Sequence, residues 1–183
     1  MTDIQSRCLD AFPQWLRTLG DDARALAQLL DHGSLPEASR RQIAGALNYL
    51  FKSLDLIPDG IEDLGFIDDA FVFRASAAAA APSESDAGRL DKTGTLARLV
   101  AEAGLVREFL GADYPRLERY VQALQTSASR GRSVDDIVKD QSLRSEFVGE
   151  VTAWASSYAS PSFARDEKNL IKLKSFLTTK LPA

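Results

Sequence analysis

The sequence predicts an all-α protein, a compact bundle of about seven to nine helices. Apolar residues recur at spacings of three and four residues along nearly the whole chain, and no stretch shows sustained alternation of apolar and polar residues. Of the 183 residues, 45% are apolar and 26% are charged, which is typical of a folded chain and too apolar for intrinsic disorder. Glycines, prolines and capping residues separate the periodic segments at intervals that suit helices.

Three helices are predicted in the first third of the chain. Residues 3–19 and 23–31 have helical patterns, with a bend expected near Pro13 and a break at Gly20. A third helix is expected to begin at Ser34, because a serine followed three residues later by a glutamate is a capping signal. Its apolar stripe is long enough for a helix of about 17 residues. The stripe consists of Ile43, Leu47, Leu50, Phe51 and Leu54.

A turn and a fourth helix follow. Pro58 disfavours helix at the preceding residue, and the Pro-Asp-Gly sequence that it begins favours a turn. The next helix is expected after Gly65, with Asp68 as its N-cap. It continues through an alanine-rich segment, which favours helix, and ends at Pro82.

The second part of the chain is predicted to be helical as well. Residues 83–95 are polar and contain two glycines, so a linker or long loop is expected there. The helices that follow are expected to begin near Leu96, Asp113, Ser133, Leu143 and Ala164. The chain therefore divides into residues 1–82 and a helical extension, residues 83–183, which we expect to pack together as one structural unit.

Several classes of site and partner are excluded or disfavoured. With one cysteine, Cys8, and one histidine, His32, the chain has no intramolecular disulfide, Cys/His zinc cluster or two-histidine metal site. Cys8 lies between apolar residues, which indicates a buried thiol, and His32 at a helix end is more typical of a cap than of a general base. The net charge of −4 disfavours nucleic acid as a partner. With neither a secretory pattern nor the run of about 20 apolar residues that spans a bilayer, we expect a cytoplasmic protein.

Residues 49–69 contain the one distinctive motif, YLFKSLDLIPDGIEDLGFIDD. This segment resembles the YkvA-like family, a bacterial domain of unknown function numbered 1232 among such domains, over residues 36–80. The residues that support the resemblance are Tyr49, Leu50, Asp55, Leu56, Ile57, Pro58, Asp59, Ile61, Gly65, Asp68 and Asp69. The resemblance implies a small bacterial helical domain within residues 1–82, and it brings no established reaction with it.

The motif is strongly acidic and allows two interpretations. In the structural one, Asp55 and Asp68 cap helices, Asp59 hydrogen-bonds its own backbone in the turn, and no cofactor is bound. In the alternative, Asp55, Asp59, Asp68 and Asp69 hold a divalent cation, since Mg²⁺ and Ca²⁺ prefer oxygen ligands. We favour the structural interpretation, and no catalytic residue is predicted. The residues expected to shape the backbone are Tyr49, Asp55, Pro58, Asp59, Gly65, Asp68 and Asp69.

Three functional hypotheses follow. The favoured one is a non-catalytic cytoplasmic interaction or adaptor protein, because every recognisable feature concerns packing or capping. The second is a metal-dependent hydrolase that uses the Asp55–Asp69 carboxylates. The third is a peripheral membrane protein that docks through the alanine-rich helix or the basic last helix without spanning the bilayer.

Overall fold

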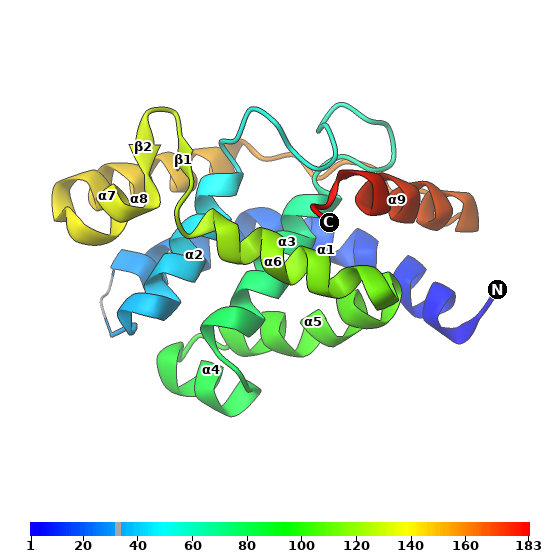
Figure 1. Cartoon of the computed structure of the whole chain (residues 1–183), viewed down its shortest axis with the longest axis horizontal. Coiled ribbons are helices and arrows are strands. Elements are labelled where there is room, and N and C mark those ends of the chain that lie inside the picture. Colours follow the sequence, from blue (N-terminus) through cyan, green and yellow to red (C-terminus); the bar gives the residue numbers. More distant parts are fainter. Residues whose placement is uncertain (32–33) are drawn as a thin grey trace.

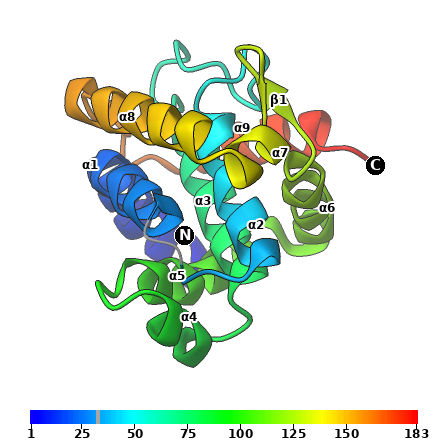
Figure 2. The ribbon, with the colours of Figure 1, turned by 90° about the vertical axis from the view of Figure 1, so that its left-hand side faces the viewer.

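Helix α3 (Ile67–Ala80) lies at the centre of the molecule, and the other helices surround it (Figure 1, Figure 2). The computed structural model describes residues 1–31 and 34–183. Helix α3 packs against α1 (Asp3–Asp31), α2 (Glu37–Tyr49), α5 (Thr95–Leu110) and α6 (Tyr114–Leu124). The prediction of an all-α fold is confirmed.

Shorter elements and two further long helices complete the fold. Helix α8 packs along α1, the short α7 packs against α2 and α8, and α4 packs against α5. These elements are α4 (Glu84–Leu90), a 3-10 turn η1 (Gly111–Asp113), β1 (Ala128–Ser129), β2 (Arg132–Ser133), α7 (Val134–Lys139), α8 (Gln141–Ser157) and α9 (Glu167–Lys180).

The two predicted N-terminal helices form the single helix α1, so the expected break at Gly20 was wrong. Pro13 also lies inside α1. Tertiary packing explains Gly20, because a β-carbon there would lie 3.2 Å from the carbonyl oxygen of Ala155 on α8. Nearby, the Tyr158 hydroxyl donates a hydrogen bond of 2.8 Å to the Leu16 carbonyl of α1. The glycine therefore permits close helix packing and does not end the helix.

Helix α2 is shorter at both ends than the sequence pattern predicts. Its N-cap residue is Pro36, with no side-chain capping hydrogen bond, so the prediction of Ser34 as the cap was wrong. The helix ends at Tyr49, and Leu54, which was expected in its apolar stripe, is 81% exposed. Leu50 and Phe51 of that stripe also lie beyond the helix, whereas Ile43 and Leu47 lie within it.

The predicted linker and the β-hairpin are two further corrections. Residues 84–90 form α4, because the hydroxyl of Ser83 caps the helix by accepting the backbone N–H of Asp86. The hairpin β1–β2 was not predicted, and its two-residue turn places Arg130 and Gly131 at positive φ values of 50° and 74°. The predicted short helix at Ser133 is confirmed as α7, with Ser133 in a capping box.

One hydrophobic cluster contains residues from both halves of the chain. At its centre, Phe12 of α1, Phe71 of α3 and Phe109 of α5 make mutual edge-on contacts with centroid distances of 5.1–5.9 Å. Such aromatic contacts stabilise a core beyond simple area burial. The C-terminal half therefore contributes directly to the core around α3.

The same three central helices share a buried group of charges. Arg74 of α3, fully buried, lies 2.6 Å from Glu102 of α5 and packs over the Trp15 ring at 4.0 Å. Asp22 of α1 is also buried and pairs with Arg98. Buried charges are tolerated only when they are paired, so these contacts fix the relative positions of α1, α3 and α5. Among the described residues, no helix combines the length and the apolar character needed to cross a bilayer.

Candidate functional site

The acidic motif forms the loop between α2 and α3, residues 50–66, together with the helix ends on either side. Inside the loop, the backbone N–H of Ile61 donates a hydrogen bond of 3.0 Å to the Pro58 carbonyl, so Pro58 begins a tight turn as predicted. Leu56, Ile57 and Leu64 point into the core and are 0–4% exposed. Buried apolar side chains therefore hold the loop against the core, and polar residues such as Asp59 and Glu62 remain exposed.

Gly65 has a specific steric role in this loop. A β-carbon at this position would lie 2.2 Å from the carbonyl oxygen of Asp59, far inside van der Waals contact. The next residue, Phe66, adopts a left-handed conformation with φ of 63° and is the N-cap residue of α3. The backbone at Gly65 therefore approaches the backbone at Asp59 so closely that only glycine fits at position 65.

Tyr49 and Asp68 join the two ends of the loop. The Tyr49 hydroxyl donates a hydrogen bond of 2.5 Å to Asp68 Oδ2 and accepts one of 2.8 Å from the Leu56 backbone N–H. The same Asp68 oxygen accepts the Ile57 N–H at 3.0 Å. Tyr49 is 1% exposed and Asp68 is fully buried. We refer to these two side chains and the two backbone N–H groups as the Tyr49–Asp68 clamp.

The clamp corrects the role predicted for Asp68. Asp68 lies in the first turn of α3 but does not cap it, because the N-cap residue is Phe66. Asp55 is half-buried in the loop and caps no helix of the described chain, and Asp59 is exposed at the turn. No side-chain hydrogen bond joins Asp59 to its own backbone in the described part of the chain. Asp68 therefore acts through a tertiary contact, and among the described residues neither Asp55 nor Asp59 has the capping or turn role that was predicted.

Burial and mutual repulsion perturb these carboxyl groups. Burial raises the pKa of Asp68 to about 7, although the hydrogen bonds from Tyr49 and Ile57 oppose the shift. The pKa of Asp69, 3% exposed on α3, is raised well above its ordinary value by burial and then by the charge of Asp68. Burial, followed by the charge of Asp59, raises the pKa of Asp55 to about 6. The group is therefore able to bind protons near neutral pH.

Two oxygens of the buried pair remain without a hydrogen bond to any described residue, namely Asp68 Oδ1 and Asp69 Oδ2. Within residues 1–31 and 34–183, however, no three aspartate, glutamate, cysteine or histidine side chains are arranged so that they could hold a metal ion. Asp68 and Asp69 are also neighbours on one helix, so their side chains leave the helix in different directions. The carboxylates interact through charge without forming a common ligand set.

A polar cavity of about 600 Å³ adjoins the loop. Lys52, at the start of the loop, donates a hydrogen bond of 2.9 Å to the Tyr120 hydroxyl, and burial lowers its pKa. On the other side, Arg130 of the hairpin packs over the Phe51 ring at 4.7 Å. The Ser129 hydroxyl also donates a hydrogen bond of 2.6 Å to the Phe51 carbonyl, which joins the hairpin to the start of the loop. The residues that line the cavity are Leu50, Phe51, Lys52, Ser53, Asp59, Ala128, Ser129 and Arg130.

Cys8, which was also considered from the sequence, does not add a catalytic group to this site. Cys8 is fully buried in α1, and burial raises the pKa of its thiol to about 12, so it is not a thiolate at neutral pH. His32 lies outside the described residues. The site therefore contains carboxyl groups, the cationic side chains of Lys52 and Arg130, and tyrosine hydroxyls around a fixed loop.

Sequence reasoning missed Tyr120 and the hairpin as parts of this site. Tyr120 lies far along the chain, and its contact with the loop depends on how α6 packs. Gly131 favours a turn, but Arg130-Gly131 is not a dipeptide typical of two-residue hairpins, and nothing local places that turn beside Phe51.

Comparison with known proteins bears on the motif alone. Residues 40–74 match the family described as "Protein of unknown function (DUF1232)", which confirms the expected resemblance at that level without identifying a YkvA-like subtype. The matched range includes the whole acidic loop and the Tyr49–Asp68 clamp. Neither curated proteins nor solved structures yield a significant match to the chain.

Proposed function

We propose that the protein is a non-catalytic cytoplasmic interaction module whose acidic loop binds a basic segment of a partner protein. The observation that carries this proposal is the Tyr49–Asp68 clamp. Its hydrogen bonds bind one carboxylate to the backbone N–H of Ile57 and hold the adjoining Leu56 in place. A carboxylate engaged in this way shapes the loop and is not free to react with a substrate.

The clamp presents a defined outer surface. Leu54 projects from the loop with 81% of its surface exposed, and the exposed carboxylates of Asp59 and Glu62 lie on the same loop. A large apolar side chain held beside like charges on a rigid backbone offers a partner an apolar contact together with a complementary charge. A rigid loop loses little conformational freedom on binding, which favours affinity.

Charge defines the chemistry of the partner. The outer part of the loop, residues 55–63, contains four acidic residues and no lysine or arginine. One of the four, Asp63, accepts a hydrogen bond of 3.1 Å from the Ser162 hydroxyl, whereas Asp59 and Glu62 remain exposed. Complementary charge on a partner would steer association and fix its orientation. The partner segment is therefore basic, with an apolar contact for Leu54.

Site-specific photo-crosslinking tests the proposal. A photoreactive amino acid replaces Leu54 in the full chain, the protein is produced in cells of its natural host, and adducts are identified after irradiation. We expect one reproducible protein adduct that carries a basic segment. The double substitution Asp59→Asn, Glu62→Gln should remove most of it, and so should high salt during irradiation.

Glu146 provides the matched control, because it is an exposed acidic residue on α8 that does not belong to the loop. A photoreactive group at this position should not capture the same protein, and Glu146→Gln should leave the Leu54 adduct unchanged. The proposal is wrong if no reproducible adduct forms at Leu54, or if both positions capture the same proteins equally.

A further inference from the structure

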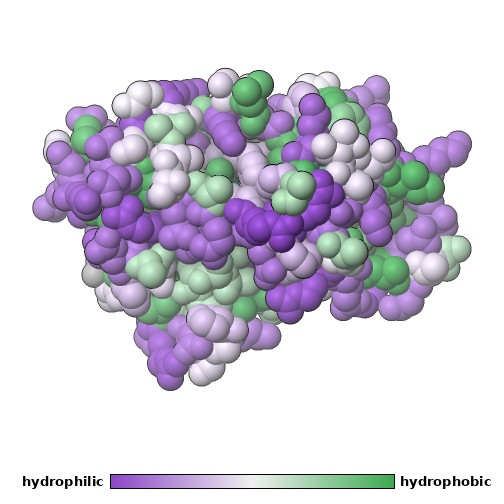
Figure 3. All heavy atoms as spheres, in the orientation of Figure 1, coloured by the Kyte–Doolittle hydropathy of each residue, from purple (hydrophilic) through white to green (hydrophobic). Residues whose placement is uncertain are grey.

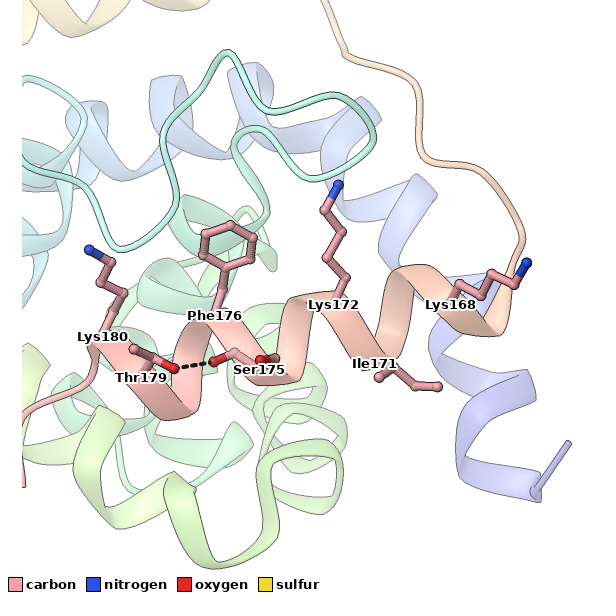
Figure 4. Close-up of a pocket in the computed structure, with 7 residues that line it drawn as sticks. All are labelled: Lys168, Ile171, Lys172, Ser175, Phe176, Thr179 and Lys180. Atoms are coloured by element: carbon pink, nitrogen blue, oxygen red, sulfur yellow. Dashed lines mark hydrogen bonds between the residues drawn. The ribbon is translucent and has the colours of Figure 1, made fainter.

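Helix α9 forms a second exposed surface of the protein, and its charge is positive where that of the acidic loop is negative (Figure 4). Its leucine stripe packs into the core, and the residues of that stripe are Leu170, Leu173 and Leu177. The outer face forms a groove of about 480 Å³, in which Ile171 is 65% exposed and Phe176 is partly buried. Figure 4 shows Phe176 between Lys172 and Lys180 along one side of the helix. The residues that line the groove are Lys168, Ile171, Lys172, Ser175, Phe176, Thr179 and Lys180.

The lysines of α9 form no ion pairs within the described protein, although the charge of Lys174 acts on Asp113, whose pKa is lowered first by hydrogen bonds from Thr178 and Arg116. None of the four ammonium groups forms an ion pair or a hydrogen bond with a described residue, in contrast to Arg165 just before the helix, which pairs with Asp10. Four lysines and one glutamate, Glu167, give the helix a charge of +3 on a chain whose net charge is −4. Helix α9 therefore carries a local excess of positive charge on an exposed surface.

The other helix that the sequence suggested as a membrane contact is not available. Most of the alanine-rich α3 is buried at the centre of the fold, including Ala75, Ala77 and Ala80. Its contacts with α1, α2, α5 and α6 cover the surface that a membrane would need. Of the two helices considered, only α9 presents an open face.

The spacing of apolar residues on α9 indicates whether its exposed face suits a lipid bilayer or a helical protein partner. A helix that binds in a groove requires a continuous apolar row at spacings of three and four residues, and here the only large apolar side chains on the outer face are Ile171 and Phe176, five residues apart. On the face of the molecule seen in Figure 3, hydrophobic residues form separate patches within a hydrophilic surface. Isolated apolar side chains between lysines suit shallow insertion among lipid headgroups, where lysine stems lie along the interface.

We propose that the exposed face of α9 docks on an anionic lipid bilayer. The lysines contact the headgroups, and Ile171 enters the boundary between headgroups and acyl chains. A smaller hollow of about 270 Å³ shares Ile171 and is also lined by Ile4 and Phe109, so the apolar surface continues past the start of α9. This docking surface is separate from the acidic loop, and it does not depend on the function proposed for that loop.

Co-sedimentation with vesicles tests the proposal. The full chain is mixed with vesicles of phosphatidylcholine and phosphatidylserine at a ratio of about 7:3 or with phosphatidylcholine alone. We expect sedimentation with the anionic vesicles and a steep loss of binding as salt rises, because surface electrostatics is screened within a Debye length. Replacing Lys168 and Lys172 with glutamine should weaken partition about 25-fold, at about five-fold per lysine. Ile171→Ser should weaken it several-fold without changing the salt dependence.

Lys139→Gln is the matched control, because Lys139 is an exposed lysine that pairs with Asp135 on α7, away from α9. Circular dichroism confirms that each variant remains folded. Absence of binding to anionic vesicles would overturn the proposal, and so would equal binding to neutral vesicles. The same holds if Lys139→Gln weakens binding as much as the α9 substitutions do.

Discussion

Replacing Tyr49 with phenylalanine removes one oxygen from the centre of the clamp. The variant loses the 2.5 Å hydrogen bond to Asp68 and leaves the buried N–H of Leu56 without its acceptor. A hydrogen bond to a charged group contributes about 1.5–3 kcal/mol, and an unsatisfied buried N–H costs about 1–3 kcal/mol. Protonation of Asp68, whose pKa is about 7, reduces the first loss. We therefore expect the free energy of unfolding to fall by about 3 kcal/mol.

Thermal and urea denaturation measure this effect. For a chain of this length, a loss of about 3 kcal/mol lowers the melting temperature by roughly 6–12 °C. Tyr158→Phe is the matched control, because it removes one hydroxyl that donates a single hydrogen bond to the Leu16 carbonyl. The control should cost about 1 kcal/mol. If Tyr49→Phe costs no more than Tyr158→Phe, the clamp does not hold the loop and the reasoning fails.

Three further outcomes test the loop. Gly65→Ala should lose about 2–3 kcal/mol of stability, because its β-carbon would overlap the Asp59 carbonyl, whereas Gly104→Ala on the open face of α5 should be neutral or slightly stabilising; equal effects in urea titrations would contradict the steric argument. The folded pKa of Asp68, about 7, lies above its ordinary 3.8, so the folded state holds its proton more tightly. Stability should therefore fall as the pH rises from about 4 through 7, and Asp68→Asn should flatten that slope in urea titrations across the range; an unchanged slope would refute this assignment. Addition of millimolar Mg²⁺ or Ca²⁺ should shift the melting temperature by no more than about one degree, and a shift of several degrees that disappears in Asp69→Asn would instead indicate a cation site.

Local signals predicted the parts of the fold that depend on neighbours in sequence. Helix α3 ends at Ala80, two residues before Pro82, because proline cannot continue a helix. Ser133 begins α7 through a capping box that requires only residues three positions apart. Pro58 begins its turn for a similar reason, since its ring restricts its own backbone and that of the preceding residue. These outcomes need no knowledge of the rest of the molecule.

The same signals failed where a distant part of the chain competed for the residue. Gly20 is a residue type typical of a helix end but lies inside α1, where a β-carbon would come within 3.2 Å of the Ala155 carbonyl oxygen on α8. Asp68 has the sequence position of a cap, yet its carboxylate accepts hydrogen bonds from Tyr49 and the Ile57 backbone. In both cases the local signal was real, and a contact across the fold determined how it was used.

Residue order alone predicts a helical protein whose distinctive motif lies in residues 49–69, because periodicity and motif spacing depend on neighbouring residues. The packing of distant segments sets which carboxylates are buried, makes Asp68 hold a loop, and leaves the lysines of α9 exposed without an ion pair to any described residue. The physical reason is that burial and ion pairing depend on which distant segments pack together, and a sequence pattern does not contain those distances.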